Sequence, residues 1–452
     1  MSEQVDVVVL GLGPGGETAA GLLGKAGLDV VAVDQHLVGG ECPFYGCVPS
    51  KMMIAAAHTL GEARRVSGRA GSAEVRPDWA PVAARIRADA THDWDDTEFV
   101  ERLERNGARF VRGRGRLLGP GRVEVTSADG TVREYDARRG VVLNTGTDPA
   151  VPPVDGVADT PFWTNRDIVQ VTELPASLGI IGGGPIGVEF AQTFARFGVQ
   201  VTLVEAAERI LEGDEPEASQ VVSAALAADG VRILTGAELG SVSYADGRFE
   251  LDLATERVGV ERLLVAAGRS NNLAGIGLPT VGVDGDAASL ETDERMRVVP
   301  RLWAVGDITG KGAFTHVSNY QARVAVRDIL GQDGPWADYR AVPRVTYTAP
   351  EVGAVGLTEA QAREAGIAVA VATADLGGRG WIAQEEGVVK LVADSQLGVL
   401  VGATTVGPSG GEMLSLLVSA VHSRIPISEL TTMMYAYPTF HRAVETALHR
   451  LR

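Results

Sequence analysis

Cys42 and Cys47 are the only cysteines of this 452-residue chain, and four residues separate them in the segment GGECPFYGCVPSK. The segment continues into VPSKMMIAAAHTLGEA, whose composition predicts a helix that begins near Cys47. A thiolate near the N-terminus of a helix is stabilised by the helix dipole, so the thiol becomes more reactive. The spacing and the position favour two thiols that act together in redox chemistry.

Two other interpretations of the cysteines are weaker. Two thiolates supply half of the four ligands of a zinc ion, and the segment holds no histidine or third cysteine to complete the set. A structural disulfide would close so short a loop that it would constrain the unfolded chain little. We therefore predict a redox pair and no metal site. Between the thiols, Pro43 suits the first turn of a helix. Phe44 and Tyr45 either form an apolar wall for a substrate or pack inside the fold.

The charge of the chain limits its partners and its location. Its formal net charge is −17, which disfavours nucleic acid or an anionic membrane as a partner. No apolar run is long enough to span a bilayer, and the first residues lead directly into a strand rather than a secretory signal. We expect a cytoplasmic protein. In that compartment a close cysteine pair is more often catalytic or metal-binding than structural.

A pattern of strand, glycine turn, helix and strand occurs twice in the sequence. Its key positions, related by an offset of 171, are Gly11, Gly13, Gly16 and Asp34 in the first copy and Gly182, Gly184, Gly187 and Glu205 in the second. In this pattern the glycines let the backbone approach a pyrophosphate and let the helix pack on the strand, and the acid can bond a ribose diol. The phosphates then lie at the helix N-terminus. The repeat predicts two dinucleotide sites.

The rest of the chain predicts further elements around these two units. Buried strands that end at glycine turns are expected at 141–146, 263–268 and 302–307, and Ala80–Asn106 is expected to be mainly helical. From Pro343 the sequence alternates as antiparallel strands do, and two helices should follow at Gly411–Ser423 and Thr439–Leu451. A chain of this length is expected to form about three domains.

Taken together, the motifs resemble the class I pyridine nucleotide–disulfide oxidoreductases, the family of dihydrolipoamide dehydrogenase, glutathione reductase and mercuric reductase. The resemblance covers essentially the whole chain. Its motifs are the two glycine fingerprints, the C-x-x-x-x-C segment ending in Pro-Ser-Lys, Thr145–Gly146, "AAGR" at 266–269, "VGD" at 305–307, "YTAPEVGAVGLTE" and Pro438–Thr439.

This resemblance implies an α/β fold of two nested Rossmann-type domains and a C-terminal α+β dimerisation domain. The implied boundaries are 1–150 with 270–340 for FAD, 151–269 for NAD(P), and 341–452 for the interface of a homodimer. FAD would be held by the first fingerprint and Asp34, together with Gly40, Thr145, Gly146 and Asp307. The nicotinamide cofactor would be held by the second fingerprint and Gly268. Glu205 at the acid position favours NADH over NADPH because a carboxylate repels a 2′-phosphate, although Arg209 lies nearby.

The resemblance also implies roles for the thiols. Cys47 would face the flavin and Cys42 would attack the substrate. Lys51 follows Cys47 by four residues and so shares its helix face. In the family pattern this lysine pairs with a glutamate, here Glu189, beside the flavin. Such a pair can stabilise negative charge that develops as hydride arrives.

The C-terminal motif departs from the family pattern. Disulfide-reducing members carry His-Pro-Thr followed by a glutamate, whereas this chain reads AYPTFHR, with Tyr437 and Arg442 at those two positions. A phenol ionises near pH 10 and imidazole near pH 6.5, so tyrosine is the poorer proton shuttle at pH 7. The loss of general acid–base help could slow thiol–disulfide turnover by ~10²–10⁴-fold. His441 either substitutes for the missing base or is an ordinary, partly exposed histidine.

Three functional hypotheses follow. The first is an enzyme in which NADH reduces FAD, then the Cys42–Cys47 disulfide, and finally a small disulfide such as lipoamide. The second is an NAD(P)H-dependent reductase of a quinone, a metal ion or another small-molecule acceptor that needs less proton chemistry. The third is a flavin-binding interaction protein without turnover.

Overall fold

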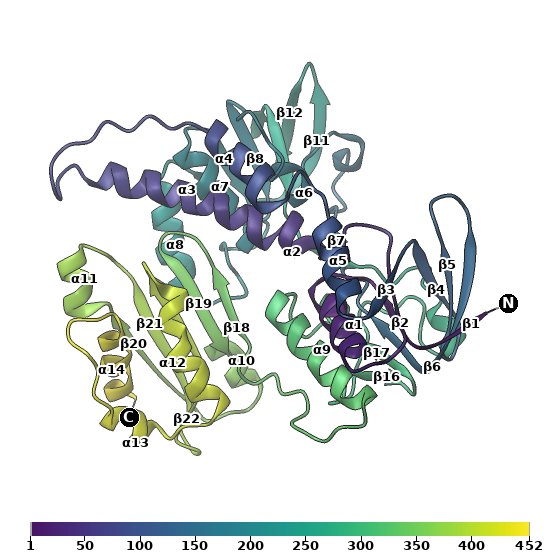
Figure 1. Ribbon diagram of the computed structural model, residues 1–452. Helices are drawn as coiled ribbons and strands as arrows, with labels where there is room; N and C mark the ends of the chain where they lie inside the picture. Colours follow the sequence, from purple (N-terminus) through teal and green to yellow (C-terminus); the bar gives the residue numbers. More distant parts are fainter. Residues whose placement is uncertain (1, 452) are drawn as a thin grey trace. The chain divides into compact units, whose positions relative to one another are not determined.

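The computed structural model describes residues 2–451, which form two compact units (Figure 1). Unit 1 comprises Met1–Pro49, Ala84–Ala150 and Arg269–Tyr339, and unit 2 comprises Ser50–Ala83, Val151–Gly268 and Arg340–Arg452. Each unit is described separately below. Within the described range, no helix is both long and apolar enough to cross a membrane.

Unit 1 is built on a mainly parallel sheet with the strand order β16-β17-β6-β1-β2-β3, to which β4 and β5 add an antiparallel extension. The strands are β1 (Glu3–Leu10), β2 (Val30–Asp34), β3 (Ala108–Arg112), β4 (Arg114–Gly119), β5 (Arg122–Thr126), β6 (Val132–Leu143), β16 (Arg297–Val299) and β17 (Leu302–Ala304). A short antiparallel pair, β7 (Thr147–Pro149) and β15 (Arg269–Asn271), completes its strands within the described residues.

Both faces of this sheet are buried, as expected for parallel strands covered on two sides. Val7 and Val9 of β1 lie in one hydrophobic core, and Val8 and Leu10 lie in the other. Successive side chains of a strand point to opposite faces, so one run of valines supplies both cores. On the first face, α1 (Pro14–Lys25) packs beside α9 (Thr315–Ile329), as Figure 1 shows.

Unit 2 contains a second parallel sheet with the order β10-β9-β8-β14. Its strands are β8 (Ser177–Ile181), β9 (Gln200–Val204), β10 (Arg232–Leu234) and β14 (Arg262–Val265), and the antiparallel strands β11 (Leu239–Ala245), β12 (Arg248–Leu253) and β13 (Arg257–Val260) follow β10 in the chain. The helices of this part are α3 (Cys47–Arg65), which begins in unit 1, and α6 (Asn165–Ile168), α7 (Pro185–Arg196) and α8 (Pro216–Ala228).

The C-terminal part of unit 2 is an antiparallel sheet with the order β18-β19-β22-β21-β20. Its strands are β18 (Pro343–Thr346), β19 (Glu351–Gly356), β20 (Val369–Asp375), β21 (Val388–Asp394) and β22 (Val399–Gly407), and its helices are α10 (Glu359–Glu364), α11 (Gly377–Ala383), α12 (Gly410–His422), α13 (Ile427–Thr432) and α14 (His441–Arg450). Helix α12, which is drawn in yellow in Figure 1, packs on this sheet. The predicted α/β class is confirmed; the three predicted domain boundaries stay predictions.

The segment Ala80–Asn106 is mainly helical, as predicted, but it does not form one continuous helix. Helix α4 (Ala80–Arg85) and a π-helical turn (Ile86–Ala90) are separated from α5 (Thr97–Arg105) by an irregular stretch. In that stretch His92, Asp93 and Trp94 all have positive φ angles, of 48°, 61° and 59°. Consecutive side-chain-bearing residues rarely adopt this conformation, which breaks a right-handed helix.

Candidate functional site

The first glycine turn leaves no room for side chains at two of its three predicted positions. Gly11 has φ +89°, and a Cβ there would lie 2.2 Å from the carbonyl oxygen of Asn144. A Cβ on Gly16 would lie 1.9 Å from the carbonyl oxygen of Gly11. Gly13 is the N-cap of α1 and has no side chain that could cap the helix. The N–H of Gly16 in the first turn donates to the Asn144 side chain, so the turn offers a phosphate mainly the positive end of the helix dipole.

The second turn has the same construction. Gly182 has φ +110°, and a Cβ there would lie 2.3 Å from the carbonyl oxygen of Ala266; a Cβ on Gly187 would lie 1.9 Å from that of Gly182. Gly184 caps α7, again with no side-chain hydrogen bond recorded among residues 2–451. A Cβ on Gly184 would meet no described atom within 4 Å. Because the fold itself does not need that glycine, the open space beside it suits the close approach of a ligand.

The repeat extends to the hydrogen bonds of the two acids. Asp34 accepts from the N–H groups of Leu12 (2.6 Å) and His36 (2.7 Å). Glu205 accepts from those of Gly183 (2.5 Å) and Ala207 (2.7 Å), the same positions 171 residues later. Each carboxylate is thereby fixed at the carboxyl end of its strand, and its remaining lone pairs can accept from a ribose diol. Burial raises the pKa of Asp34, and the two backbone N–H groups partly offset this effect. Both turns fit a dinucleotide.

The predicted contacts around the first turn also gather in unit 1. Gly40 has φ +66°, and a Cβ on it would lie 2.8 Å from the Cα of Gly13, so the loop that carries the thiols packs directly on the glycine turn. Thr145 follows β6, and its buried hydroxyl has no hydrogen-bond partner within the described part of the chain. Gly146 has φ +68° with no atom of the described residues near its missing Cβ. An orphaned hydroxyl and an open glycine at a strand end fit a bound polar ligand.

Asp307 belongs to a chain of polar contacts that sequence analysis missed. The Thr147 hydroxyl donates to Asp307 at 2.8 Å and accepts from the Arg269 guanidinium at 2.6 Å. Arg269 also lies 3.6 Å from Glu41, the residue before Cys42. Gly268, with φ +124°, immediately precedes Arg269. Thr147 follows the Thr145–Gly146 motif directly, and this proximity was the only available signal for its role.

Asn144 joins the first glycine turn to β17. Its side-chain oxygen accepts from the N–H of Gly16 at 2.7 Å, and its amide donates to the carbonyl of Val305 at 2.8 Å. In the second turn Ala266 takes the equivalent place, because its carbonyl abuts Gly182 as that of Asn144 abuts Gly11. Asn144 is therefore an additional tether in the first site.

The two cysteines lie in unit 1, on helices that follow one another in the chain. Cys42 lies in the one-turn helix α2 (Glu41–Phe44) and is half-buried, and Cys47 is the first residue of α3 and is exposed. The sulfur of Cys47 lies 3.4 Å from the hydroxyl of Thr315, the first residue of α9. Nothing in the local sequence of Cys47 indicates this partner, which is 268 positions away.

The loop between the cysteines is held from within unit 1. Phe44 is completely buried, with its ring 5.3 Å from that of Phe99, so it packs inside the fold and does not form a substrate wall. The indole N–H of Trp94 donates to the carbonyl of Phe44 at 3.2 Å. Asp96 accepts from the N–H of Val38 at 2.6 Å. These contacts give the unusual backbone of 92–94 a structural reason.

Lys51 and Glu189 meet inside unit 2. The Lys51 ammonium lies 2.7 Å from one carboxylate oxygen of Glu189, and the other oxygen accepts from the N–H of Tyr347 at 2.8 Å. The same ammonium lies 4.8 Å from the centre of the Tyr347 ring. A cation between a carboxylate and an aromatic face is fixed in place by both contacts. Tyr347 belongs to the motif YTAPEVGAVGLTE, but sequence reasoning assigned it no role.

Tyr437 is 74% exposed, in the loop before α14. The guanidinium of Arg442 lies 5.8 Å from its ring centre and forms an ion pair with Glu445. His441 is half-buried as the first residue of α14. The charge of Arg442 is thus already paired with a carboxylate of the same helix.

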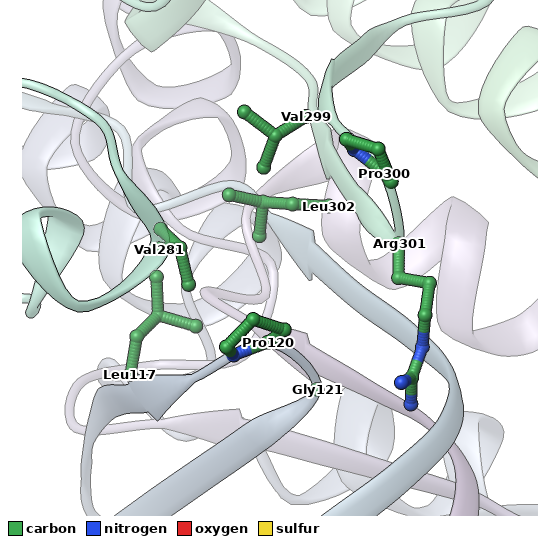
Figure 2. A pocket seen from close by; sticks show the side chains of 8 residues that line it. All are labelled: Leu117, Pro120, Gly121, Val281, Val299, Pro300, Arg301 and Leu302. Atoms are coloured by element: carbon green, nitrogen blue, oxygen red, sulfur yellow. The ribbon is translucent and has the colours of Figure 1, made fainter.

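A small pocket in unit 1, lined by residues that include Leu117, Val281, Val299 and Leu302, has a volume of about 20 Å³ (Figure 2). Such a volume holds one water molecule at most. Leu302 is the first residue of β17, so the pocket lies at the amino ends of the parallel strands, whereas nucleotides bind at their carboxyl ends. The pocket is not a cofactor site.

Comparison with known proteins identifies the family. Residues 5–325 match the pyridine nucleotide-disulphide oxidoreductase family, and residues 342–448 match its dimerisation domain. The chain is 33% identical to a dihydrolipoyl dehydrogenase of Halobacterium salinarum. The alignment of the two covers 100% of this chain and 97% of the relative. It is 31% identical to a mercuric reductase of Acidithiobacillus ferrooxidans, over 98% of this chain and 82% of the relative.

Two solved structures share the fold over the full length of both chains. LpdA from Mycobacterium tuberculosis superposes with a TM-score of 0.87 at 27% identity. The Cu(II) complex of RclA, a HOCl-induced flavoprotein disulfide reductase from Escherichia coli, superposes with a TM-score of 0.86 at 26% identity.

These matches confirm the predicted resemblance, the predicted dimerisation domain and, for the family, the use of FAD and NAD(P)H. Members of the family are disulfide oxidoreductases, so the prediction of an enzyme is confirmed as well. The chain belongs to the pyridine nucleotide-disulphide oxidoreductase family.

Proposed function

We propose that this protein is an FAD-containing, NADH-dependent reductase that uses Cys42 and Cys47 to reduce a small disulfide of the lipoamide type. The observation that carries the proposal is the contact of Gly40 with Gly13, which packs the thiol-bearing loop on a glycine turn built for a dinucleotide. The curated relatives named dihydrolipoyl dehydrogenase support the substrate class.

When bound, FAD would supply the two-electron chemistry that links a hydride from the reduced nicotinamide to the reduction of a disulfide. The first turn and Asp34 would hold the ADP part of FAD. Gly40, Thr145, Gly146 and Asp307 would contact the remainder of the FAD molecule. The second turn, Glu205 and Gly268 would hold the nicotinamide cofactor. Glu205 favours NADH, and Arg209 does not counteract it, because its guanidinium donates to the carbonyls of Leu211, Glu212 and Asp214.

The thiols perform the exchange with substrate. The Cys42 thiolate attacks one sulfur of the substrate disulfide, the substrate S–S bond breaks, and the leaving thiolate takes a proton. The Cys47 thiolate then attacks the Cys42 sulfur, the Cys42–Cys47 disulfide forms, and the second thiol leaves with a proton. The protons of the two product thiols balance those lost by the two enzyme thiols. Over a full cycle, one NADH and one proton are consumed for each disulfide reduced.

Lys51 would supply a fixed positive charge close to this exchange. It follows Cys47 by one turn of α3 and is held by Glu189 and Tyr347. A preorganised cation stabilises negative charge that develops nearby during electron transfer. Tyr437 would take the place of the usual histidine as a hydrogen-bond donor.

The matched dimerisation domain supports a homodimer. We propose the cytoplasm as the compartment, where a close cysteine pair is more often redox-active than structural.

A second candidate function is the reduction of a metal ion. The similarity to the Cu(II) complex of RclA and the absence of the usual histidine and glutamate at 437 and 442 favour it. Two Cu(II) ions would each take one electron from the dithiol, which becomes a disulfide and releases two protons. No leaving thiolate needs protonation in this reaction.

An anaerobic NADH titration followed by an acceptor panel tests both candidates. We expect NADH to bleach the flavin absorbance, and lipoamide, low-molecular-weight disulfides, Cu(II), mercuric ion and quinones are then offered separately. Lipoamide reduction that is lost in Cys42→Ser supports the first function. Cu(I) formation without disulfide reduction supports the second. Disulfide reduction that survives Cys42→Ser would refute the thiol relay, and a flavin that NADH does not bleach would indicate a binding protein.

A further inference from the structure

The Cys47 sulfur lies at the N-terminal ends of two helices. Cys47 is the first residue of α3, and its sulfur is 3.4 Å from the hydroxyl of Thr315, the first residue of α9. These helices are 19 and 15 residues long. Both therefore direct their positive ends towards the same sulfur.

The protonation state of the sulfur fixes the direction of this hydrogen bond. A thiolate has no proton, so it can only accept, and the Thr315 hydroxyl must then donate. A hydrogen bond to a charged acceptor is stronger than one between neutral groups. The contact therefore stabilises the thiolate more than the thiol.

We propose that Thr315 is a catalytic residue whose hydroxyl holds Cys47 as a thiolate during turnover. The proposal rests on the proposed function, in which Cys47 is one of the two redox thiols. In disulfide reductases with a C-terminal histidine, an imidazolium can pair with a thiolate, but the phenol at position 437 cannot. A threonine hydroxyl supplies a hydrogen bond without itself titrating between pH 4 and 10, so its support for the thiolate does not vary with pH.

Other ionisable groups belong to the elements around Cys47. They are Cys42 and Glu41 on α2, Lys51 on α3, His316 on α9 and Lys311 in the turn before α9. Glu41 is paired with Arg269, Lys51 is paired with Glu189, and the His316 ring stacks on that of Phe314 at 5.2 Å. His316 is the one imidazole in this set. A His316→Gln variant therefore separates its effect from that of Thr315.

The test measures the pH midpoint of Cys47 alkylation in the full-length flavoprotein. In a Cys42→Ser background Cys47 is the only cysteine of the chain, so iodoacetamide modification followed by mass spectrometry reports this thiol alone. Thr315→Val keeps the shape and removes the hydroxyl, and we expect it to raise the midpoint by ~1 pH unit, about a tenfold loss of thiolate below the midpoint. Thr315→Ser should retain the wild-type midpoint, and Thr315→Ala provides a second hydroxyl-free variant.

Thr18→Val is the matched control. It removes a hydroxyl that donates to Asn319 of α9 at 2.9 Å but that has no recorded contact with Cys47 in the described chain. An unchanged midpoint in both Thr315→Val and Thr315→Ala would overturn the proposal. An equal rise in Thr18→Val or His316→Gln would also overturn it, because the shift would then come from α9 in general or from the histidine. The assay uses neither NADH nor an electron acceptor, so a failed acceptor panel leaves its result unaffected.

Discussion

The ammonium of Lys51 lies 2.7 Å from the carboxylate of Glu189, although 138 positions separate the two residues in the chain. The Glu189 side chain is 7% exposed and that of Lys51 is 36% exposed, so the pair is screened from water mainly on the glutamate side. Glu189 also accepts from the Tyr347 N–H, which orients its carboxylate towards the lysine.

Lys51→Met should slow the reduction of bound flavin by NADH. The change removes a preorganised positive charge, and we expect at least a ~10-fold loss in the anaerobic stopped-flow rate of bleaching. Lys51→Arg should retain most of the rate because it keeps the charge. Lys25→Met, at an exposed lysine at the end of α1, serves as the control and should leave the rate unchanged. Wild-type bleaching in Lys51→Met would show that the pair has only a structural role.

Glu205→Ser should reduce the preference for NADH over NADPH. The serine cannot repel a 2′-phosphate, and we expect the ratio of kcat/KM values for the two coenzymes to fall ~10-fold or more. Arg209→Gln should leave the ratio unchanged, because the arginine already donates to backbone carbonyls. If the arginine variant changed the ratio as much as the glutamate variant, our assignment of Glu205 would be wrong.

His58 should make the protein less stable in mild acid. Burial, with the nearby charge of Arg196, lowers its pKa from 6.5 to about 4, and a hydrogen bond to the backbone of Tyr347 opposes the shift. Between these values the unfolded chain binds a proton that the folded chain does not, so stability decreases as the pH falls from about 6.5 to about 4. Allowing for partial solvent screening, the loss should be roughly 1–2 kcal/mol.

Urea unfolding at pH 5 and pH 7.5 measures this effect. His58→Gln should make the difference in the free energy of unfolding between pH 5 and pH 7.5 smaller by the amount expected for His58. The matched control is His422→Gln, at an exposed histidine at the end of α12, which should leave the difference unchanged. A wild-type pH dependence in His58→Gln would assign the acid sensitivity to other groups.

Lys390→Met should strongly destabilise unit 2. The lysine is 5% exposed, and its ammonium lies about 3 Å from the carboxylates of Glu215, Glu217 and Glu359. Removing the cation leaves three carboxylates around a buried site, and we expect a loss of about 3–5 kcal/mol in the free energy of unfolding. Arg105→Gln breaks an exposed pair with Glu101 and should cost less than ~0.5 kcal/mol. Similar losses for the two variants in urea unfolding would contradict this explanation.

The glycine turns and their acids could be predicted from the sequence. Gly11, Gly16 and Asp34 are required by contacts within one strand–turn–helix–strand unit and with one neighbouring strand, and the unit repeats at Gly182, Gly187 and Glu205. A fixed spacing is enough to place such residues, because the rise of strands and helices converts it into geometry. The alternation after Pro343 predicted the C-terminal antiparallel sheet for the same reason.

The segment Ala80–Asn106 shows what this reasoning leaves open. The segment is mainly helical, as predicted, but the sequence did not indicate the interruption of the helix at 92–94. Trp94 and Asp96 instead bond to Phe44 and Val38, which lie about fifty residues earlier in the chain. Tertiary contacts of this kind override local helix propensity.

The family, the two nucleotide turns, the pair Cys42 and Cys47 and the departure at Tyr437 could all be inferred from the amino-acid sequence, because each depends on residue types at short spacings. The groups that contact these residues depend on how the chain folds. The fold places Thr315 on the Cys47 sulfur, Asn144 on the Gly16 N–H and Tyr347 on the Lys51 ammonium. These partners are more than a hundred positions apart in the chain, and only the packing of helices and strands brings them within contact distance.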